Sequence, residues 1–97
     1  MEIKSTTEGT RLTITVSGRV DTVTSPELAA ALKLGDATCV VIDLKDVPYM
    51  SSAGIRILLT AYKTMHGKGG ELLLANVQAT VREVLDITGF SDIFNIV

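Results

Sequence analysis

The residues best placed to do chemistry form the short stretch Ser51-Ser52-Ala53-Gly54, which lies between an apolar segment and a predicted helix. Two adjacent hydroxyls at this point permit two interpretations. One serine can cap the helix by accepting a hydrogen bond from an unpaired backbone N–H, which stabilises a helix by about 1 kcal/mol. Alternatively, one serine is an exposed working residue at the C-terminal edge of a parallel strand, where sites of open α/β sheets collect. The residues alone favour the cap and leave both interpretations open.

The chain also contains the residue types of a Ser-His-Asp triad, with Ser52, the single His66 and several aspartates. Apolar spacing predicts one helix over residues 52–66, so fourteen residues separate the serine from the histidine by roughly 21 Å. A general base must lie within about 3 Å of the proton that it takes. No serine lies in a G-x-S-x-G motif. We therefore predict no catalytic residues and no enzyme activity, and interpret His66 as exposed at the negative end of the helix dipole.

Metal-binding and phosphate-binding patterns are also missing from the sequence. One histidine and one cysteine on different predicted elements have no ligand spacing. The glycines of Gly67-Lys68-Gly69-Gly70 follow a predicted helix, whereas the glycines of a phosphate-binding loop precede one. We interpret them as a turn, and predict neither a metal site nor a cofactor.

The composition restricts the class of protein further. In 97 residues, nine basic and eleven acidic side chains give a net charge of -2 without a basic run, which disfavours nucleic-acid binding. No apolar stretch approaches the roughly 18 residues of a membrane span, and the N-terminus has no signal-peptide pattern. The lone Cys39 cannot form an internal disulfide and is expected to be a small buried hydrophobic residue. These features predict a cytoplasmic protein with no membrane insertion.

Apolar patterns predict the strands that lead to the two serines. Polar and apolar residues alternate over 10–18, which indicates a half-buried strand, and a glycine-containing turn joins it to a strand over 2–7. The continuously apolar segment 39–44 is typical of a strand covered on both faces. Further strands are predicted over 71–75 and 93–96.

Three helices are predicted between these strands. Thr24 opens a capping motif for a short helix that ends near Leu34, and the second helix covers residues 52–66. The third helix begins after a capping Asn76 and ends at Gly89 in the C′ position. The order ββαβαβαβ, with right-handed crossovers between parallel strands, indicates one α/β domain over residues 1–97.

Several segments together resemble one protein family. Val40-Val41-Ile42-Asp43-Leu44, followed by Val47-Pro48-Tyr49-Met50-Ser51-Ser52-Ala53-Gly54-Ile55, resembles the signature of STAS domains, in particular bacterial anti-sigma factor antagonists. In that signature a D-S/T-x-G loop opens a helix. Gly18-Arg19-Val20-Asp21 resembles the family's G-x-hydrophobic-D element, and Leu85-Asp86-Ile87-Thr88-Gly89-Phe90 resembles its closing turn. The resemblance runs from about residue 3 to residue 97.

The resemblance implies a fold and a function. The expected fold is a mixed central β-sheet with helices packed mainly on one face. The expected function is that of an anti-sigma factor antagonist, which binds an anti-sigma factor when unphosphorylated and so releases a sigma factor. The anti-sigma factor is itself a serine kinase that phosphorylates the antagonist, and a serine phosphatase reverses the modification. By position, Ser52 is the phosphoacceptor, Gly54 the loop glycine and Asp21 the nearby acidic residue.

One position departs from the family pattern, because Ser51 replaces the aspartate before the acceptor. Ser51 is therefore a competing acceptor, although Ser52 has the family spacing to Gly54. The missing charge also gives weight to an alternative function. In that alternative the chain is a STAS subunit of a lipid-trafficking ABC transport assembly at the membrane, and the loop hydroxyl is structural.

The predicted partner surface surrounds Ser52 and combines one side of the helix with the loop near residue 21. For Arg56 and Lys63 simple solubility is an equal alternative, and Asp21 can instead cap its own turn. Gly54 either gives a partner's active site room to reach the hydroxyl or allows close packing. The complete set of predicted contacts is Asp21, Thr22, Ser51, Ser52, Ala53, Gly54, Arg56, Thr60 and Lys63.

Overall fold

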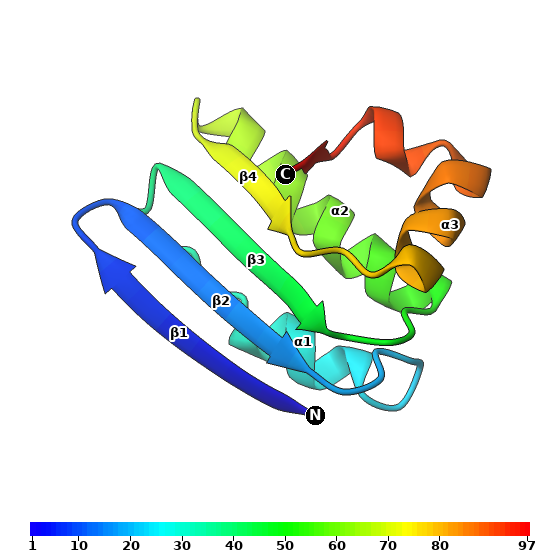
Figure 1. The fold of residues 1–97 in the computed structure, drawn as a ribbon. Helices are drawn as coiled ribbons and strands as arrows, with labels where there is room; N and C mark the ends of the chain where they lie inside the picture. The colour runs from blue at the N-terminus through cyan, green and yellow to red at the C-terminus, as the bar shows by residue number, and fades with distance from the viewer.

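The computed structural model describes all residues 1–97 and contains a five-stranded mixed sheet in the order β1-β2-β3-β4-β5 (Figure 1). β1 (Glu2–Glu8) and β2 (Arg11–Ser17) form an antiparallel hairpin. β3 (Cys39–Asp46), β4 (Glu71–Ala75) and β5 (Asn95–Ile96) follow as parallel strands. The predicted element order and the parallel pairing of the two apolar central strands are confirmed.

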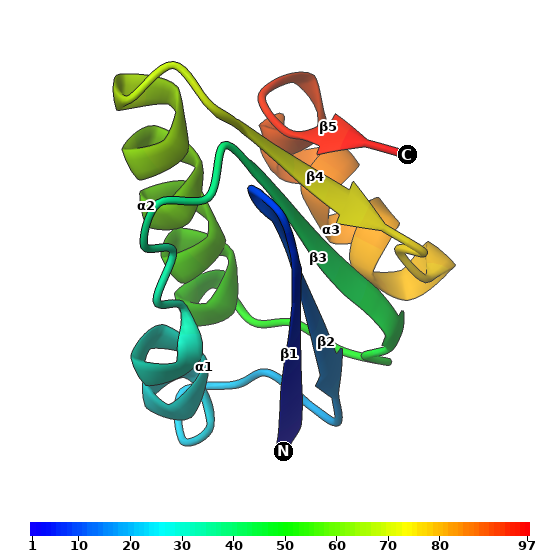
Figure 2. The same ribbon diagram turned by 90° about the vertical axis from the view of Figure 1, so that its left-hand side faces the viewer.

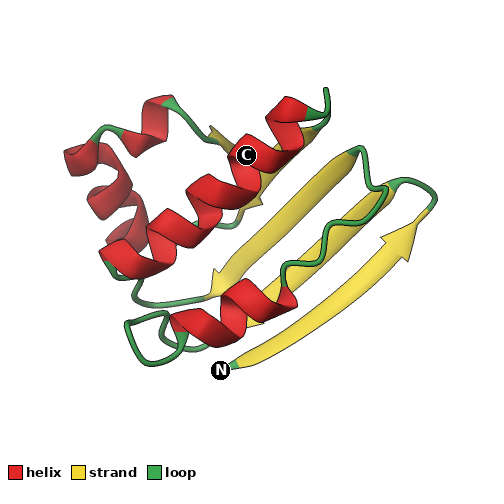
Figure 3. Ribbon diagram, turned by 180° about the vertical axis from the view of Figure 1, so that it is seen from behind, coloured by secondary structure: helices red, strands yellow, loops and turns green.

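The helices lie mainly on one face of this sheet. α1 (Ser25–Ala31) and α2 (Ser52–Gly67) pack side by side against that face, as Figures 2 and 3 show. α3 (Ala79–Thr88) lies beyond β4, away from β1, and continues into the short 3-10 helix η1 (Phe90–Asp92). This arrangement confirms the expected distribution of helices.

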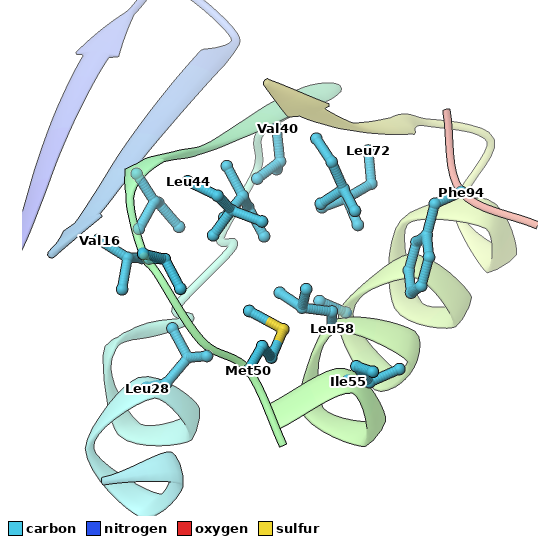
Figure 4. Close-up of a cluster of buried hydrophobic side chains, with 14 of the residues drawn as sticks. Val16, Leu28, Val40, Leu44, Met50, Ile55, Leu58, Leu72 and Phe94 are labelled. Atoms are coloured by element: carbon cyan, nitrogen blue, oxygen red, sulfur yellow. The ribbon is translucent and has the colours of Figure 1, made fainter. Parts of the chain in front are cut away.

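The core lies between the sheet and α2. Alternate strand residues point to the helix side, because successive side chains of a strand face opposite ways. In Figure 4, Val16, Val40, Leu44 and Leu72 from the sheet face Leu58 of α2. The residues of this cluster that are fully shielded from solvent include Ile14, Val16, Val40, Ile42, Leu44, Leu58, Met65, Leu74 and Leu85.

The other face of the sheet carries no helix, so the prediction that residues 39–44 are covered on both faces is wrong. Val41 is nevertheless only 7% exposed, because Thr13 and Leu73 flank it in register on the neighbouring strands. Cys39 is on the same face and is only half-buried, so its predicted full burial is also wrong. Partial burial raises the pKa of the Cys39 thiol, and the nearby Glu71 carboxyl adds to this shift.

The first helix is shorter than predicted. α1 ends at Ala31, and Leu32 leaves the helical conformation with φ -80° and ψ 67°, so residues 32–34 belong to the loop before β3. Thr24 does occupy the N-cap position, but its side chain makes no capping hydrogen bond. Its hydroxyl instead donates to the Arg19 carbonyl and accepts from the Asp21 N–H. The hydroxyl is therefore committed to the preceding turn.

The third helix begins later than predicted, so Asn76 is not its cap. Asn76 has φ 55°, and its side-chain amide donates to the Asp43 carboxylate at 3.1 Å. Gln78 is the N-cap residue. At the other end the prediction is confirmed, because Gly89 closes the helix in the left-handed conformation with φ 81°.

The uncovered face can be tested with two adjacent leucines of β4. Leu74 points to the helices and is fully buried, whereas Leu73 is half-buried on the uncovered face. We expect Leu74→Ala to lower the free energy of unfolding by about 2–5 kcal/mol, and Leu73→Ala by less than half as much. Urea denaturation of both variants measures the difference. Equal losses would contradict the one-sided arrangement.

Candidate functional site

Two loops meet at the start of α2 and form the candidate site. An isolated parallel bridge joins Val20 to Met50, both of which are buried. The Val20 N–H donates to the Tyr49 carbonyl at 3.0 Å, and the Ser51 N–H donates to the Val20 carbonyl at 2.7 Å. These bonds hold the loop around Asp21 beside the loop that carries the two serines.

The loop before α2 is also anchored from the side of α3. The Thr80 hydroxyl donates to the Pro48 carbonyl at 2.8 Å, and the Gln78 side-chain amide donates to the Lys45 carbonyl at 2.7 Å. The backbone that leads into the serines is therefore fixed on both sides.

The two serines have different positions at the helix start. Ser51 is the N-cap residue, with an extended backbone (φ -79°, ψ 170°), and its Oγ accepts from the Gly54 N–H at 3.4 Å. Its side chain is half-buried. Ser52 is the first helical residue and is exposed. The cap interpretation is therefore confirmed for Ser51, and the Ser52 hydroxyl is left free of the capping role.

Gly54 allows the close approach of α2 to both loops. It is buried, and a Cβ at this position would lie 2.5 Å from Cγ1 of Val20 and 2.9 Å from Cγ of Met50. Real side chains do not approach so closely. Of the two interpretations of this glycine, the structure favours close packing over direct contact with a partner.

Asp21 organises the turn before α1, so the alternative that it caps its own turn is confirmed. Its Oδ1 accepts from the N–H groups of Val23 and Thr24, each at 3.0 Å, and from the Thr24 hydroxyl at 3.2 Å. The backbone hydrogen bond from Thr24 is the largest cause that holds the pKa of Asp21 below its ordinary value of 3.8, and Arg19 contributes a smaller effect. The charged carboxylate is thus part of the local fold.

Sequence reasoning missed three exposed residues beside this turn. The Arg19 guanidinium lies 4.4 Å from the centre of the Tyr49 ring, which is the geometry of a cation–π contact. Val23 is 83% exposed and Tyr49 is 40% exposed. The sequence carried no signal for them, because Val23 and Tyr49 are apolar like the buried Val20, Val47 and Met50, and only the fold leaves them exposed.

The remaining predicted contacts lie on one side of the structure. Arg56, Thr60 and Lys63 are exposed on α2, at helical spacing from Ser52, and the Thr60 hydroxyl donates to the Arg56 carbonyl at 3.1 Å. Thr22 is exposed in the loop before α1, and Ala53 is half-buried. The exposed residues Thr22, Ser52 and Arg56 therefore form a rim around the helix start, whereas Lys63 lies eleven residues after Ser52, roughly 16 Å along the helix axis.

The structure does not bring together the side chains of a catalytic triad or of a metal site. Ser52 and His66 lie at opposite ends of α2, which separates them as predicted. No group of three or more His, Cys, Asp and Glu side chains could hold a metal ion, and no helix is long and apolar enough to cross a membrane. A groove of about 410 Å³ lies between α1 and the second half of α2, and neither serine lines it.

Comparison with protein families gives one match that covers nearly the whole chain. The model of the STAS domain matches residues 2–97. A putative anti-sigma factor antagonist, BtrV of Bordetella bronchiseptica, is 44% identical over 68 residues, which are 70% of this chain and 58% of that protein. The anti-sigma-B factor antagonist of Listeria monocytogenes is 33% identical over 86 residues, which are 86% of this chain and 75% of that protein.

A solved structure agrees with the fold. The crystal structure of an anti-sigma factor antagonist from Mycobacterium paratuberculosis superposes with a TM-score of 0.86 at 26% sequence identity. The match covers 98% of this chain and 83% of that one. The strand order and the helix at the candidate site are therefore a shared architecture.

The packing role of Gly54 leads to a prediction with a matched control. We expect Gly54→Ala to lower the free energy of unfolding by about 1–3 kcal/mol, because the new methyl group overlaps Val20 and Met50. In the control Gly67→Ala, in the last turn of the same helix, a Cβ meets nothing within 4 Å. Chemical denaturation should show the control unchanged or stabilised by up to about 1 kcal/mol. A loss equal to that of Gly54→Ala would contradict the packing role.

The lowered pKa of Asp21 predicts a pH dependence of stability. Its charged form stabilises the fold, so the contribution is present above pH 3.8 and is lost as the pH falls through the lower folded-state value. We expect Asp21→Asn to have a lower Tm than the parent near neutral pH, and the difference to shrink as the pH falls below 3.8 and the carboxylate is protonated in both states. Differential scanning calorimetry across this range measures it. Asp36→Asn, in an exposed loop, controls for the general change in charge. A difference that persists in acid would show that the charge is not responsible.

Proposed function

Because the chain belongs to the STAS domain family, we propose that it is an anti-sigma factor antagonist that is switched off by phosphorylation of Ser52. Relatives at 44% and 33% identity bear the names of anti-sigma factor antagonists, which supports this assignment. The observation that carries the proposal is the division of roles between the serines. Ser51 caps α2, and Ser52 exposes a hydroxyl at the same helix start.

Ser52 is the preferred acceptor because its hydroxyl has no structural task as a cap. A kinase that modifies Ser51 must first withdraw the capping oxygen from the Gly54 N–H, which costs the helix about 1 kcal/mol. Ser51 is also half-buried, whereas Ser52 is exposed. The exposure of the side chain and the cost of breaking the cap therefore both favour Ser52 as the acceptor.

The fold can accommodate the added phosphate. Phosphorylation adds about 1.5 to 2 negative charges, and the positive end of a helix dipole and its free N–H groups favour an anion at this position. The first turn of α2 contains no acidic residue to repel it. Arg56 lies four residues after Ser52, which places it on the same side of the helix. The phosphate must therefore release the partner by weakening the contact between the two proteins, and not by changing the fold.

Repulsion by the partner provides the release. In this proposal the partner is an anti-sigma factor with serine kinase activity, whose contact surface approaches the rim around Ser52. A phosphate about 4 Å from an acidic group costs about 4 kcal/mol per charge pair near a protein surface. Half of that energy is enough to weaken binding more than tenfold. A serine phosphatase would restore the binding form.

The proposed contact surface extends beyond the residues predicted from sequence. Arginine and tyrosine are enriched at the residues that contribute most to protein interfaces. Arg19 and Tyr49 are in contact with each other, and the exposed Val23 lies in the adjoining loop. We include these three side chains with the exposed residues of α2 in the partner-binding surface.

The switch can be tested with two variants of the acceptor. We expect Ser52→Asp to weaken binding to the cognate anti-sigma factor more than tenfold, whereas Ser52→Ala keeps binding and can no longer be switched off. Both should unfold within about 0.5 kcal/mol of the parent, since Ser52 is an exposed surface residue. Isothermal titration calorimetry and chemical denaturation measure the two quantities.

Two controls separate the site from general charge effects. Thr38→Asp adds the same charge in the exposed loop before β3, at the other end of the sheet from Ser52, and should keep binding. Mass spectrometry of the protein recovered from its host should locate phosphate on Ser52. Phosphate confined to Ser51, or equal binding by Ser52→Asp and Ser52→Ala, would overturn the proposal. Recovery of the chain with a lipid permease complex would favour the transport alternative.

A further inference from the structure

The sheet has one long unpaired edge. β1 is the outermost strand in Figure 1, seven residues long, and pairs with β2 on one side only. The other edge strand, β5, has only two residues. β1 contains no proline and no bulge, and its only features that can oppose pairing are the charged side chains of Glu2, Lys4 and Glu8. Its outer backbone N–H and C=O groups are therefore available to another strand.

The charges of β1 are arranged so that the strand complements itself. Lys4, Thr6 and Glu8 lie on the same face, opposite Thr15, Thr13 and Arg11 of β2. If two copies of β1 pair antiparallel around Thr6, Lys4 of each copy lies opposite Glu8 of the other. Thr6 then lies opposite Thr6, and Ser5 opposite Thr7. Opposite charges and threonine pairs at facing positions both stabilise antiparallel strands.

The two neighbouring registers are less favourable. Pairing around Thr7 places Thr6 opposite Glu8 and Lys4 opposite Thr10, so no opposite charges face each other. Pairing around Ser5 places Glu2 opposite Glu8, and like charges at facing positions are destabilising. The ion pair between Lys4 and Glu2 within the chain, at 3.5 Å, does not compete strongly, because the two side chains are 76% and 69% exposed. Glu8 would lie between Arg11 of its own chain and Lys4 of the other copy.

From this arrangement we propose that two copies of the chain form a symmetric dimer through β1, paired antiparallel around Thr6, which joins the two sheets into one. Five residues from each copy, 4–8, take part, so the interface is small and the dimer is weak. The contact uses the edge of the sheet and no residue of the rim around Ser52. The dimer is therefore independent of the proposed phosphorylation switch.

A charge-swap experiment tests the partner and the register together. Sedimentation equilibrium of the parent chain, from roughly 10 µM to 1 mM, should show a monomer–dimer equilibrium in the range of weak complexes. Lys4→Glu and Glu8→Lys each replace both interchain ion pairs by like charges, so each should raise the dissociation constant about tenfold. The double variant Lys4→Glu/Glu8→Lys restores both pairs with reversed sign and should return to the parent value.

Matched controls change the net charge by the same amount elsewhere. Glu83→Lys, exposed on α3, corresponds to Glu8→Lys, and Lys45→Glu, exposed at the end of β3, corresponds to Lys4→Glu. Both controls and Ser52→Asp should leave the dimer unchanged, and circular dichroism verifies that every variant is folded. A chain that stays monomeric, a dimer insensitive to the two single changes, or a double variant that does not recover would each overturn the proposal.

Discussion

The backbone pairing of Val20 with the segment before α2 is the constraint on which the candidate site depends. Val20 is fully buried, and its N–H and C=O groups bond to Tyr49 and Ser51 on the opposite loop. A buried backbone group that lost such a partner would cost about 1–3 kcal/mol. The absence of a side chain at Gly54 lets the helix start pack directly on this pair. The loop at residue 21, the serines and the first turn of α2 therefore form one rigid unit.

Within this unit the two neighbouring serines differ in position, because Ser51 caps α2 and Ser52 is exposed. Serine and aspartate are about equally good N-cap residues, because each offers a side-chain oxygen to the helix N–H groups. Ser51 stands where the resembling family has aspartate, and it makes the capping contact to Gly54. The replacement thus keeps the cap and removes only a negative charge. The replacement of aspartate by Ser51 is therefore explained by capping. It gives no reason to assign a structural role to the hydroxyl of Ser52, which makes no capping hydrogen bond.

Patterns that reflect burial could be predicted from the sequence, whereas contacts between distant segments could not. The alternation in 10–18 and the helical spacing in 52–66 report the faces that pack on the core, and both elements formed as expected. Thr24 and Asn76 have good local capping chemistry, but Asp21 and Asp43 compete for their side chains. Val41 is buried because its neighbours Thr13 and Leu73 shield it. An apolar run in the sequence does not distinguish this burial by neighbouring strands from burial under a helix. The Arg19–Tyr49 contact joins two loops that only the fold brings together.

The charge around the helix start indicates how one modification can have a large effect. The carboxylate of Asp21 is used within its own turn, and its second oxygen lies 3.9 Å from Arg19. The other charged residues of the proposed surface, Arg56 and Lys63, are positive and exposed. In the proposed complex, these positive side chains would attract an acidic partner surface over a distance of about one Debye length. A phosphate on Ser52 would offset the positive charge of Arg56, four residues away, whereas Lys63 lies roughly 16 Å from Ser52 along the helix, beyond the Debye length. Phosphorylation would thus replace attraction between the two proteins by repulsion at Ser52. The fold of this protein would stay unchanged.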